Sequence, residues 1–239
     1  MKTLTKRQKK VKELVGDKKL YSPKDAIKKL KEVSSSLKLK FDETLELAVR
    51  LGIDPKQSDQ QVRSSVSLPG GTGKEIKICV IARGEKVKEA QNAGANTVGE
   101  PDDMIPKIEK GFMDFDKLVV TPEIMPQLAK LGKVLGPKGL MPNPKDGTVS
   151  TDLARTIKEL KSGKVSFRAE KESGIIHAPI GKISFDDKNL LQNFGVVIES
   201  INKLKPASAK GIYIRSVYLS TTMGPSLKID VNALNVSEN

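Results

Sequence analysis

The sequence contains one cysteine, one histidine and no long hydrophobic run. A lone cysteine, Cys79, excludes an intrachain disulfide framework and is typical of a reducing compartment. With His177 as the one histidine, a zinc site of Cys and His ligands cannot form, and no pair of carboxylates is arranged for acid–base catalysis. We therefore predict no metal, no cofactor and no catalytic residue. No apolar run reaches the roughly 18–20 residues that a membrane-spanning helix needs.

Residues 1–20 carry eight Lys or Arg residues against two acidic ones, and no apolar stretch follows them. We therefore expect no secretory signal peptide. An organellar transit peptide stays open, although such peptides are rich in Arg and Ser and this segment is rich in Lys. We interpret the segment as a mobile basic arm or a frayed helix.

Positive charge dominates the chain, with 42 basic and 29 acidic residues and a net charge of +13. An excess of this size indicates a polyanionic partner, nucleic acid first and an acidic membrane second. The chain lacks a basic amphipathic helix with bulky aromatic residues, which weakens the membrane alternative. A charged surface that serves solubility alone is the other interpretation.

This charge is concentrated at the two ends of the chain. Residues 68–159 hold 14 basic and 13 acidic residues, a net charge of +1. Residues 1–67 and 160–239 together hold 28 basic and 16 acidic residues, a net charge of +12. If the two ends fold together around an inserted middle, one domain contacts the polyanion and the other mostly does not.

Both ends show alternating strands and amphipathic helices. Ser22 and Pro23 predict the start of a helix, which the serines at 34–36 end. Residues 44–51 alternate apolar and polar side chains, as a half-buried strand does. Neither end alone has enough strands for a stable sheet. Further strands are predicted at 61–68, 164–169, 175–179, 211–221 and 227–231, with an amphipathic helix from about 190 to 204.

The middle of the chain has a different pattern. A nearly continuous apolar strand at 76–82 is of the kind that is buried on both faces of a parallel sheet. Residues 132–147 contain four glycines and three prolines and predict an irregular loop. The remaining elements alternate as in an α/β unit: helices at 85–93, 105–110, about 124–131 and 151–161, and strands at 97–98 and 118–120.

Together these patterns predict an α+β outer domain that is discontinuous, residues 1–67 and 160–239, with an inserted α/β domain, residues 68–159. The inserted domain is expected to be Rossmann-like with three layers. The chain crosses between the two domains near 68–71 and 160–163, where we expect a hinge.

One glycine-rich segment, Gly71–Lys74, resembles part of a nucleotide-binding loop. The Walker pattern needs a glycine where Leu68 stands, and a Ser or Thr to hold magnesium where Glu75 stands. A flexible linker is therefore the favoured interpretation. The broken pattern also argues against a phosphate-using enzyme built on the inserted α/β domain.

Other segments have two interpretations each. The stretch 131–149 places lysines among glycines, which allows an anion site or a rigid irregular loop. Ser220–Ser226 follows a strand, and its hydroxyls and backbone either bind RNA backbone and 2′-hydroxyls or form a plain hairpin turn. Phe41 belongs either to the core or to a surface against which RNA packs. For His177, packing or a surface hydrogen bond is favoured over RNA contact.

Long blocks of the sequence resemble the large-subunit ribosomal proteins of the L-one family, in its bacterial branch. The segment LGPKGLMPNPKDGTV at 135–149 is similar to the family signature. The resemblance covers almost the whole chain, up to Asp230. The other matching blocks are KFDET at 40–44, LGIDP at 51–55, SDQQVR at 58–63, SLPGGTGK at 67–74, FMDFD at 112–116, IIHAPIGK at 175–182 and IRSVYLSTTMGPS at 214–226.

The resemblance implies a structural constituent of the large ribosomal subunit and not an enzyme. It implies binding to the mobile stalk of large-subunit ribosomal RNA near the tRNA exit site, and assistance in the release of exit-site tRNA. It also implies repression of translation through binding to the protein's own operon messenger RNA. A second hypothesis is that this repression is the main role of the protein, and it would use the same RNA-binding surface. The implied location is the bacterial ribosome in the cytoplasm rather than an organellar ribosome, with no membrane and no small-molecule partner.

The resemblance also implies which residues contact RNA. Phe41 and Met223 would pack on the RNA, while Thr44, Ser216 and Thr222 would form hydrogen bonds to sugar edges and backbone. The full set of main contacts is Lys40, Phe41, Thr44, Ser216, Thr222, Met223 and Gly224. Weaker candidates are Arg168, Lys171 and His177 in the outer domain, and Lys133, Lys138 and Lys145 as a secondary contact of the inserted domain.

Overall fold

The computed structural model describes residues 5–16, 20–37 and 39–234. The chain divides into two compact units, which we call the outer unit (Met1–Gly73 and Val165–Asn239) and the inserted unit (Lys74–Lys164). The chain leaves the outer unit six residues after the predicted boundary at 67 and returns five residues after the one at 159.

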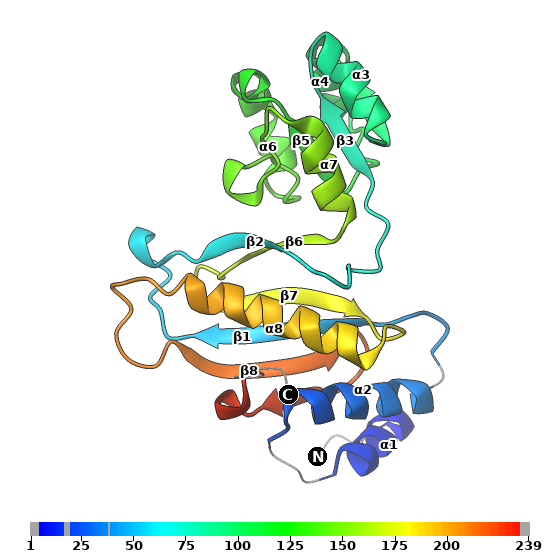
Figure 1. The fold of residues 1–239 in the computed structure, drawn as a ribbon, viewed down its shortest axis with the longest axis vertical. Coiled ribbons are helices and arrows are strands. Elements are labelled where there is room, and N and C mark those ends of the chain that lie inside the picture. Colours follow the sequence, from blue (N-terminus) through cyan, green and yellow to red (C-terminus); the bar gives the residue numbers. More distant parts are fainter. Residues whose placement is uncertain (1–4, 17–19, 38, 235–239) are drawn as a thin grey trace. The chain divides into compact units, whose positions relative to one another are not determined.

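A four-stranded antiparallel sheet forms the centre of the outer unit (Figure 1). Its order is β7-β1-β8-β9, so strands from both ends of the chain pair with one another. Compared with the predictions, β7 ends three residues later and β8 begins three residues later. The strands are β1 (Thr44–Leu51), β7 (Ile175–Lys182), β8 (Ile214–Thr221) and β9 (Ser226–Ile229).

Two helices, α2 (Pro23–Leu37) and α8 (Asp187–Lys203), cover one face of this sheet (Figure 1). The prediction of a half-buried strand is confirmed, since every second residue of β1 from Leu45 to Leu51 is at most 2% exposed. Glu46 and Arg50 point to the opposite face and are exposed. We call this the open face of the sheet.

Helix α2 begins as predicted and ends later than predicted. The Asp25 N–H donates to the Ser22 hydroxyl at 3.1 Å, which caps the first turn. The serines at 34–36 do not stop the helix, because the hydroxyls of Ser35 and Ser36 donate to carbonyls of the preceding turn and fit within it.

Helix α1 (Lys6–Val15) stands where we predicted a mobile arm or a frayed helix. Thr5 and Gln8 form a capping box: the Gln8 N–H donates to the Thr5 hydroxyl at 3.3 Å, and the Thr5 N–H donates to Gln8 Oε1 at 3.0 Å. At the other end, the Tyr21 hydroxyl donates to the Val15 carbonyl at 2.8 Å. Residues 6–15 are therefore helical, as one of the two predicted alternatives has it, and residues 1–4 and 17–19 lie outside the described residues.

A second sheet of the outer unit pairs β2 (Arg63–Ser67) with β6 (Lys164–Arg168). After β2 the chain is anchored by Asn193 of α8, which is fully buried. The Gly70 N–H donates to Asn193 Oδ1 at 2.9 Å, and Asn193 Nδ2 donates to the Gly71 carbonyl at 3.1 Å. This amide fixes the chain shortly before it leaves the outer unit.

The inserted unit contains a three-stranded parallel sheet in the order β4-β3-β5, which confirms the predicted parallel arrangement. All four residues of β3 are buried, with Ile78 and Val80 on one face and Cys79 and Ile81 on the other. Helices α3 and α7 cover the first face, and α4 and the segment 122–135 cover the second. The bounds are β3 (Ile78–Ile81), α3 (Glu85–Asn92), β4 (Thr97–Gly99), α4 (Pro101–Glu109), β5 (Lys117–Val120) and α7 (Leu153–Lys161).

The segment 122–135 differs from the prediction of one helix at 124–131 and a loop from 132. It is a series of short helical turns that continues to Leu135, because Leu131 and Leu135 are both buried against the sheet, four residues apart. The turns are η2 (Pro122–Ile124), α5 (Met125–Leu128), η3 (Ala129–Leu131) and α6 (Gly132–Leu135); other 3-10 turns are η1 (Ser58–Gln60), η4 (Pro144–Asp146) and η5 (Val231–Ala233).

Candidate nucleic-acid interface

The end of β8 and the start of β1 are joined through a turn at residues 221–224. The Thr222 N–H donates to the Thr44 carbonyl at 3.1 Å, and the Thr44 N–H donates to the Thr222 hydroxyl at 3.1 Å. The Gly224 N–H closes the turn by donating to the Thr221 carbonyl at 3.1 Å. We call this segment the 221–224 turn. The structure therefore brings together four of the seven predicted main contacts, namely Thr44, Thr222, Met223 and Gly224.

A buried carboxylate supports the same turn. Glu43 has no exposed surface, and its Oε1 accepts the Met223 N–H at 2.8 Å. Among the described residues, Glu43 Oε2 and the hydroxyls of Thr221 and Tyr213 are buried without a hydrogen-bond partner. Sequence reasoning missed Glu43, although the alternation of β1 places position 43 on the same side as the buried Leu45. Glu43 fixes the Met223 backbone rather than facing solvent.

Gly224 allows the turn to close tightly. A Cβ atom at this position would lie 2.2 Å from the Thr221 hydroxyl oxygen, which is far inside van der Waals contact. Pro225 follows and fixes its own backbone φ before β9 begins. The tight turn thus requires a glycine at position 224, whereas the RNA contact of Gly224 stays a prediction.

Phe41 and Met223 are large hydrophobic side chains that the fold leaves exposed, by 52% and 48% respectively. Phe41 lies two residues before Glu43, which holds Met223. The alternative that Phe41 belongs to the core is therefore wrong. Exposed apolar side chains on a fixed backbone are suited to packing against sugars and bases.

Positive charge and a hydroxyl lie beside the turn. Lys182 Nζ donates to the Thr44 hydroxyl at 3.0 Å and to the Asp42 carbonyl at 3.2 Å. Since the Thr44 hydroxyl accepts from Lys182, its own hydrogen remains available to a ligand acceptor. Lys40, at the start of this segment, is exposed. Lys182 was not among the predicted contacts.

Ser216 lies on the open face but at the opposite end of the sheet from the turn. It pairs with Arg50, whereas Thr221 pairs with Leu45. His177 of β7 pairs with Ala48, midway between the two ends. The predicted contacts thus lie along one face of the sheet rather than at a single point.

The weaker candidates of the outer unit lie on β6, on β7 and on the segment between these strands. His177 Nε2 lies 3.7 Å from Glu170 Oε1, and both side chains are more than half exposed, so this pair adds little stability. Arg168 and Lys171 are exposed and line a cavity together with Arg63. Glu170 and Glu172 line the same cavity, so its three cations are partly balanced by two acidic side chains.

Lys133, Lys138 and Lys145 belong to the inserted unit and are all exposed. Lys133 lies in α6, Lys145 lies in η4, and Lys138 Nζ contacts the Met113 sulfur. These positions fit both interpretations of the stretch 131–149, an anion site and a rigid irregular loop.

The lone thiol is part of the core of the inserted unit. Cys79 is fully buried in β3, and this burial raises its pKa to about 12. Over the described ranges, no three side chains of His, Cys, Asp or Glu are grouped so that they could hold a metal ion. None of the described helices has the length and hydropathy that a membrane crossing requires.

The chain is similar to known proteins over most of its length. Residues 28–225 match the Ribosomal protein L1p/L10e family. The chain is 52% identical to the large ribosomal subunit protein uL1 of Prochlorococcus marinus, over 100% of this chain and 99% of that protein. It is 51% identical to the protein of the same name in Gloeobacter violaceus (97% and 95% coverage) and 54% identical to that of Persephonella marina (92% and 90%).

These relatives are named as ribosomal proteins of bacteria and not as enzymes. The resemblance predicted from the motif blocks is confirmed. The chain belongs to the Ribosomal protein L1p/L10e family.

Proposed function

We propose that the chain is a structural component of the large ribosomal subunit that binds ribosomal RNA through the 221–224 turn and the open face of the outer sheet. The relatives are named for the large ribosomal subunit, and the ends of the chain carry a net charge of +12. The observation that carries the proposal is Met223, an exposed apolar side chain whose backbone N–H is held by the buried Glu43.

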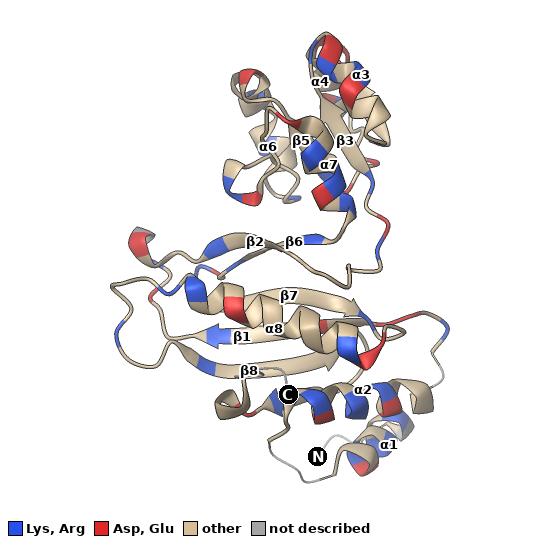
Figure 2. Cartoon of the chain, in the orientation of Figure 1, with Lys and Arg blue, Asp and Glu red and all other residues tan. Residues whose placement is uncertain are grey.

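The physical argument rests on preorganisation. The turn is tied to β1 before RNA arrives, so little conformational entropy is lost on binding. Phe41 and Met223 offer apolar surface to riboses and bases, and the Thr44 hydroxyl can donate to a sugar or phosphate oxygen. Lys and Arg residues lie on β1, β8 and the helices of the outer unit (Figure 2) and supply the long-range attraction.

The finer roles follow from the family resemblance. The RNA target is the mobile stalk near the tRNA exit site, and the inserted unit swings about the two chain crossings while exit-site tRNA is released. Lys133, Lys138 and Lys145 supply a secondary RNA contact. The same surface also binds a leader segment of the protein's own operon messenger RNA, whose fold is similar to that of the stalk RNA. This binding represses translation. The protein acts in the cytoplasm of a bacterium.

Two substitutions test the site. Met223→Ala and Thr222→Ala should each weaken binding to a stalk RNA fragment by about 1–3 kcal/mol, because they remove apolar packing or an anchor of the turn. Leu20→Ala is the control, since Leu20 is 46% exposed and outside the site. Far-ultraviolet circular dichroism checks that each variant is folded. Unchanged affinity in both site variants would overturn the assignment.

A further inference from the structure

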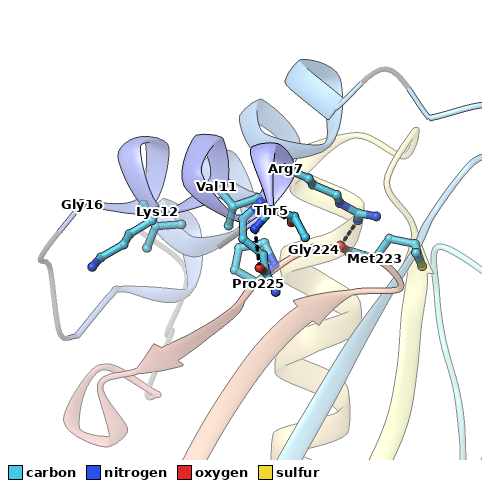
Figure 3. Close-up of a pocket in the computed structure, with 10 residues that line it drawn as sticks. Thr5, Arg7, Val11, Lys12, Gly16, Met223, Gly224 and Pro225 are labelled. Atoms are coloured by element: carbon cyan, nitrogen blue, oxygen red, sulfur yellow. Dashed lines mark hydrogen bonds between the residues drawn. The ribbon is translucent and has the colours of Figure 1, made fainter. Parts of the chain in front are cut away.

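A cavity of about 590 Å³ lies between helix α1 and the 221–224 turn (Figure 3). One wall is a single face of α1 that includes Val11 and Val15, and the other wall is formed by Met223, Gly224 and Pro225. Because Met223 and Gly224 belong to both, the cavity is continuous with the proposed RNA surface. Its volume falls in the range of small-molecule pockets, roughly 300–1,000 Å³.

The walls of this cavity combine two cationic side chains with apolar ones. None of its ten lining residues is acidic, and two of them, Arg7 and Lys12, are basic. Figure 3 shows Arg7 reaching to Met223, where its guanidinium donates to the Met223 carbonyl, and Lys12 farther along the helix, before Gly16. Arg7 and Lys12 are five residues apart, which corresponds to a rise of roughly 7.5 Å between their backbone positions along the helix axis.

We propose that this cavity is a subsite for one unpaired nucleotide of the bound RNA. The base packs against Val11, Val15 and Pro225, and Arg7 and Lys12 bind the phosphates that flank it. The inference rests on the proposed RNA-binding function and adds α1 to its surface.

A nucleotide fits this site better than a purely apolar or purely ionic ligand. Unpaired bases are recognised by apolar and aromatic surfaces, and their phosphates by Arg and Lys. One N–H group of Arg7 is used by the Met223 carbonyl, and a guanidinium has five, so the others can face a phosphate. The donated hydrogen bond also orients the guanidinium at the mouth of the cavity.

Helix α1 is held in place independently of any ligand. The capping box fixes its start, and Lys10 Nζ donates to the Ser36 carbonyl of α2 at 2.7 Å. The Val15 carbonyl accepts from Tyr21 near the end of the helix. The subsite therefore exists before RNA binds, which lowers the entropic cost of occupying it.

The test compares two lysines of the same helix in the full-length chain. Lys12 lines the cavity, whereas Lys9 is exposed and does not. The probe is a large-subunit stalk RNA fragment that contains unpaired nucleotides, and its Kd is measured across a series of salt concentrations. We expect Lys12→Gln to raise the Kd at least threefold and to reduce the salt slope by about one. Lys9→Gln should change the Kd by less than twofold.

Crosslinking locates the nucleotide itself. 4-Thiouridine is placed at one unpaired position of the same RNA at a time. We expect one of these positions to crosslink to residues 5–16, and Val11→Asp to abolish that crosslink. The subsite would be overturned if the two lysine variants had equal effects on the Kd, or if no position of the RNA gave a crosslink to α1. In either case, tight binding of the RNA by the unchanged protein would leave the proposed function intact. If the unchanged protein does not bind the RNA, the proposed function itself fails.

Discussion

Asn193→Leu should destabilise the outer unit, because the Asn193 amide serves three backbone groups that leucine cannot serve. It accepts from the Gly70 N–H at 2.9 Å, and it donates to the carbonyls of Gly71 at 3.1 Å and Ile180 at 2.7 Å. The side chain is fully buried in α8. Leucine has a similar size, so the lost hydrogen bonds dominate the expected effect.

The magnitude follows from where these groups lie. The bond to the Ile180 carbonyl is buried, and leaving such a group unpaired costs about 1–3 kcal/mol. The bonds to Gly70 and Gly71 are partly buried, so water can replace part of each, and their loss costs about 0.5–1.5 kcal/mol apiece. The free energy of unfolding should therefore fall by roughly 2–6 kcal/mol.

Tyrosine fluorescence during urea unfolding reports on the outer unit alone. The chain has no tryptophan, and its three tyrosines, Tyr21, Tyr213 and Tyr218, all belong to that unit. Gln192→Leu is the matched control, because Gln192 neighbours Asn193 on α8 and is exposed, so it should change stability by less than about 0.5 kcal/mol. An Asn193→Leu midpoint equal to that of the control would refute the anchoring role.

Four further outcomes are expected. Gly52→Ala should lower the urea midpoint of tyrosine fluorescence by the equivalent of about 1–3 kcal/mol, because the added Cβ atom would lie 2.2 Å from the Ile212 carbonyl oxygen. An unchanged midpoint would contradict this clash. Burial raises the pKa of Cys79 to about 12, above its unfolded value near 9, so the stability of the inserted unit should decrease as pH rises above 9. At pH 8 a thiol reagent should label Cys79 slowly before urea unfolding and quickly after it, and rapid labelling of the folded chain argues against this burial. Glu43→Ala should reduce RNA affinity about tenfold in a filter-binding assay by freeing the Met223 backbone, and full affinity would show that the carboxylate is dispensable.

Sequence patterns predicted the elements whose side chains alternate or form continuous apolar runs. Strand β1 matched its prediction at both ends because alternation over eight residues sets one face toward the core. A strand at 76–82 was predicted as buried on both faces because its apolar run is nearly continuous; β3 begins at Ile78, after Lys77, and its four residues are buried in a parallel sheet.

Other features depend on contacts that local patterns do not encode. The abundance of Gly and Pro after residue 131 suggested a loop, yet the burial of Leu135 against the sheet extends the helical turns. The bond between Glu43 and Met223 joins residues 180 positions apart, and only the pairing of β1 with β8 brings them together. The same pairing places Ser216 at the far end of the sheet from the 221–224 turn.

The most direct test of RNA binding by the outer unit is the Kd of the full-length chain for a purified large-subunit stalk RNA fragment as a function of salt. Several Lys and Arg contacts to phosphates should give a steep linear decrease of log affinity with log salt concentration, and Met223→Ala should lower the whole line without changing its slope. Absence of binding at moderate ionic strength, or an affinity that does not depend on salt, would contradict the account.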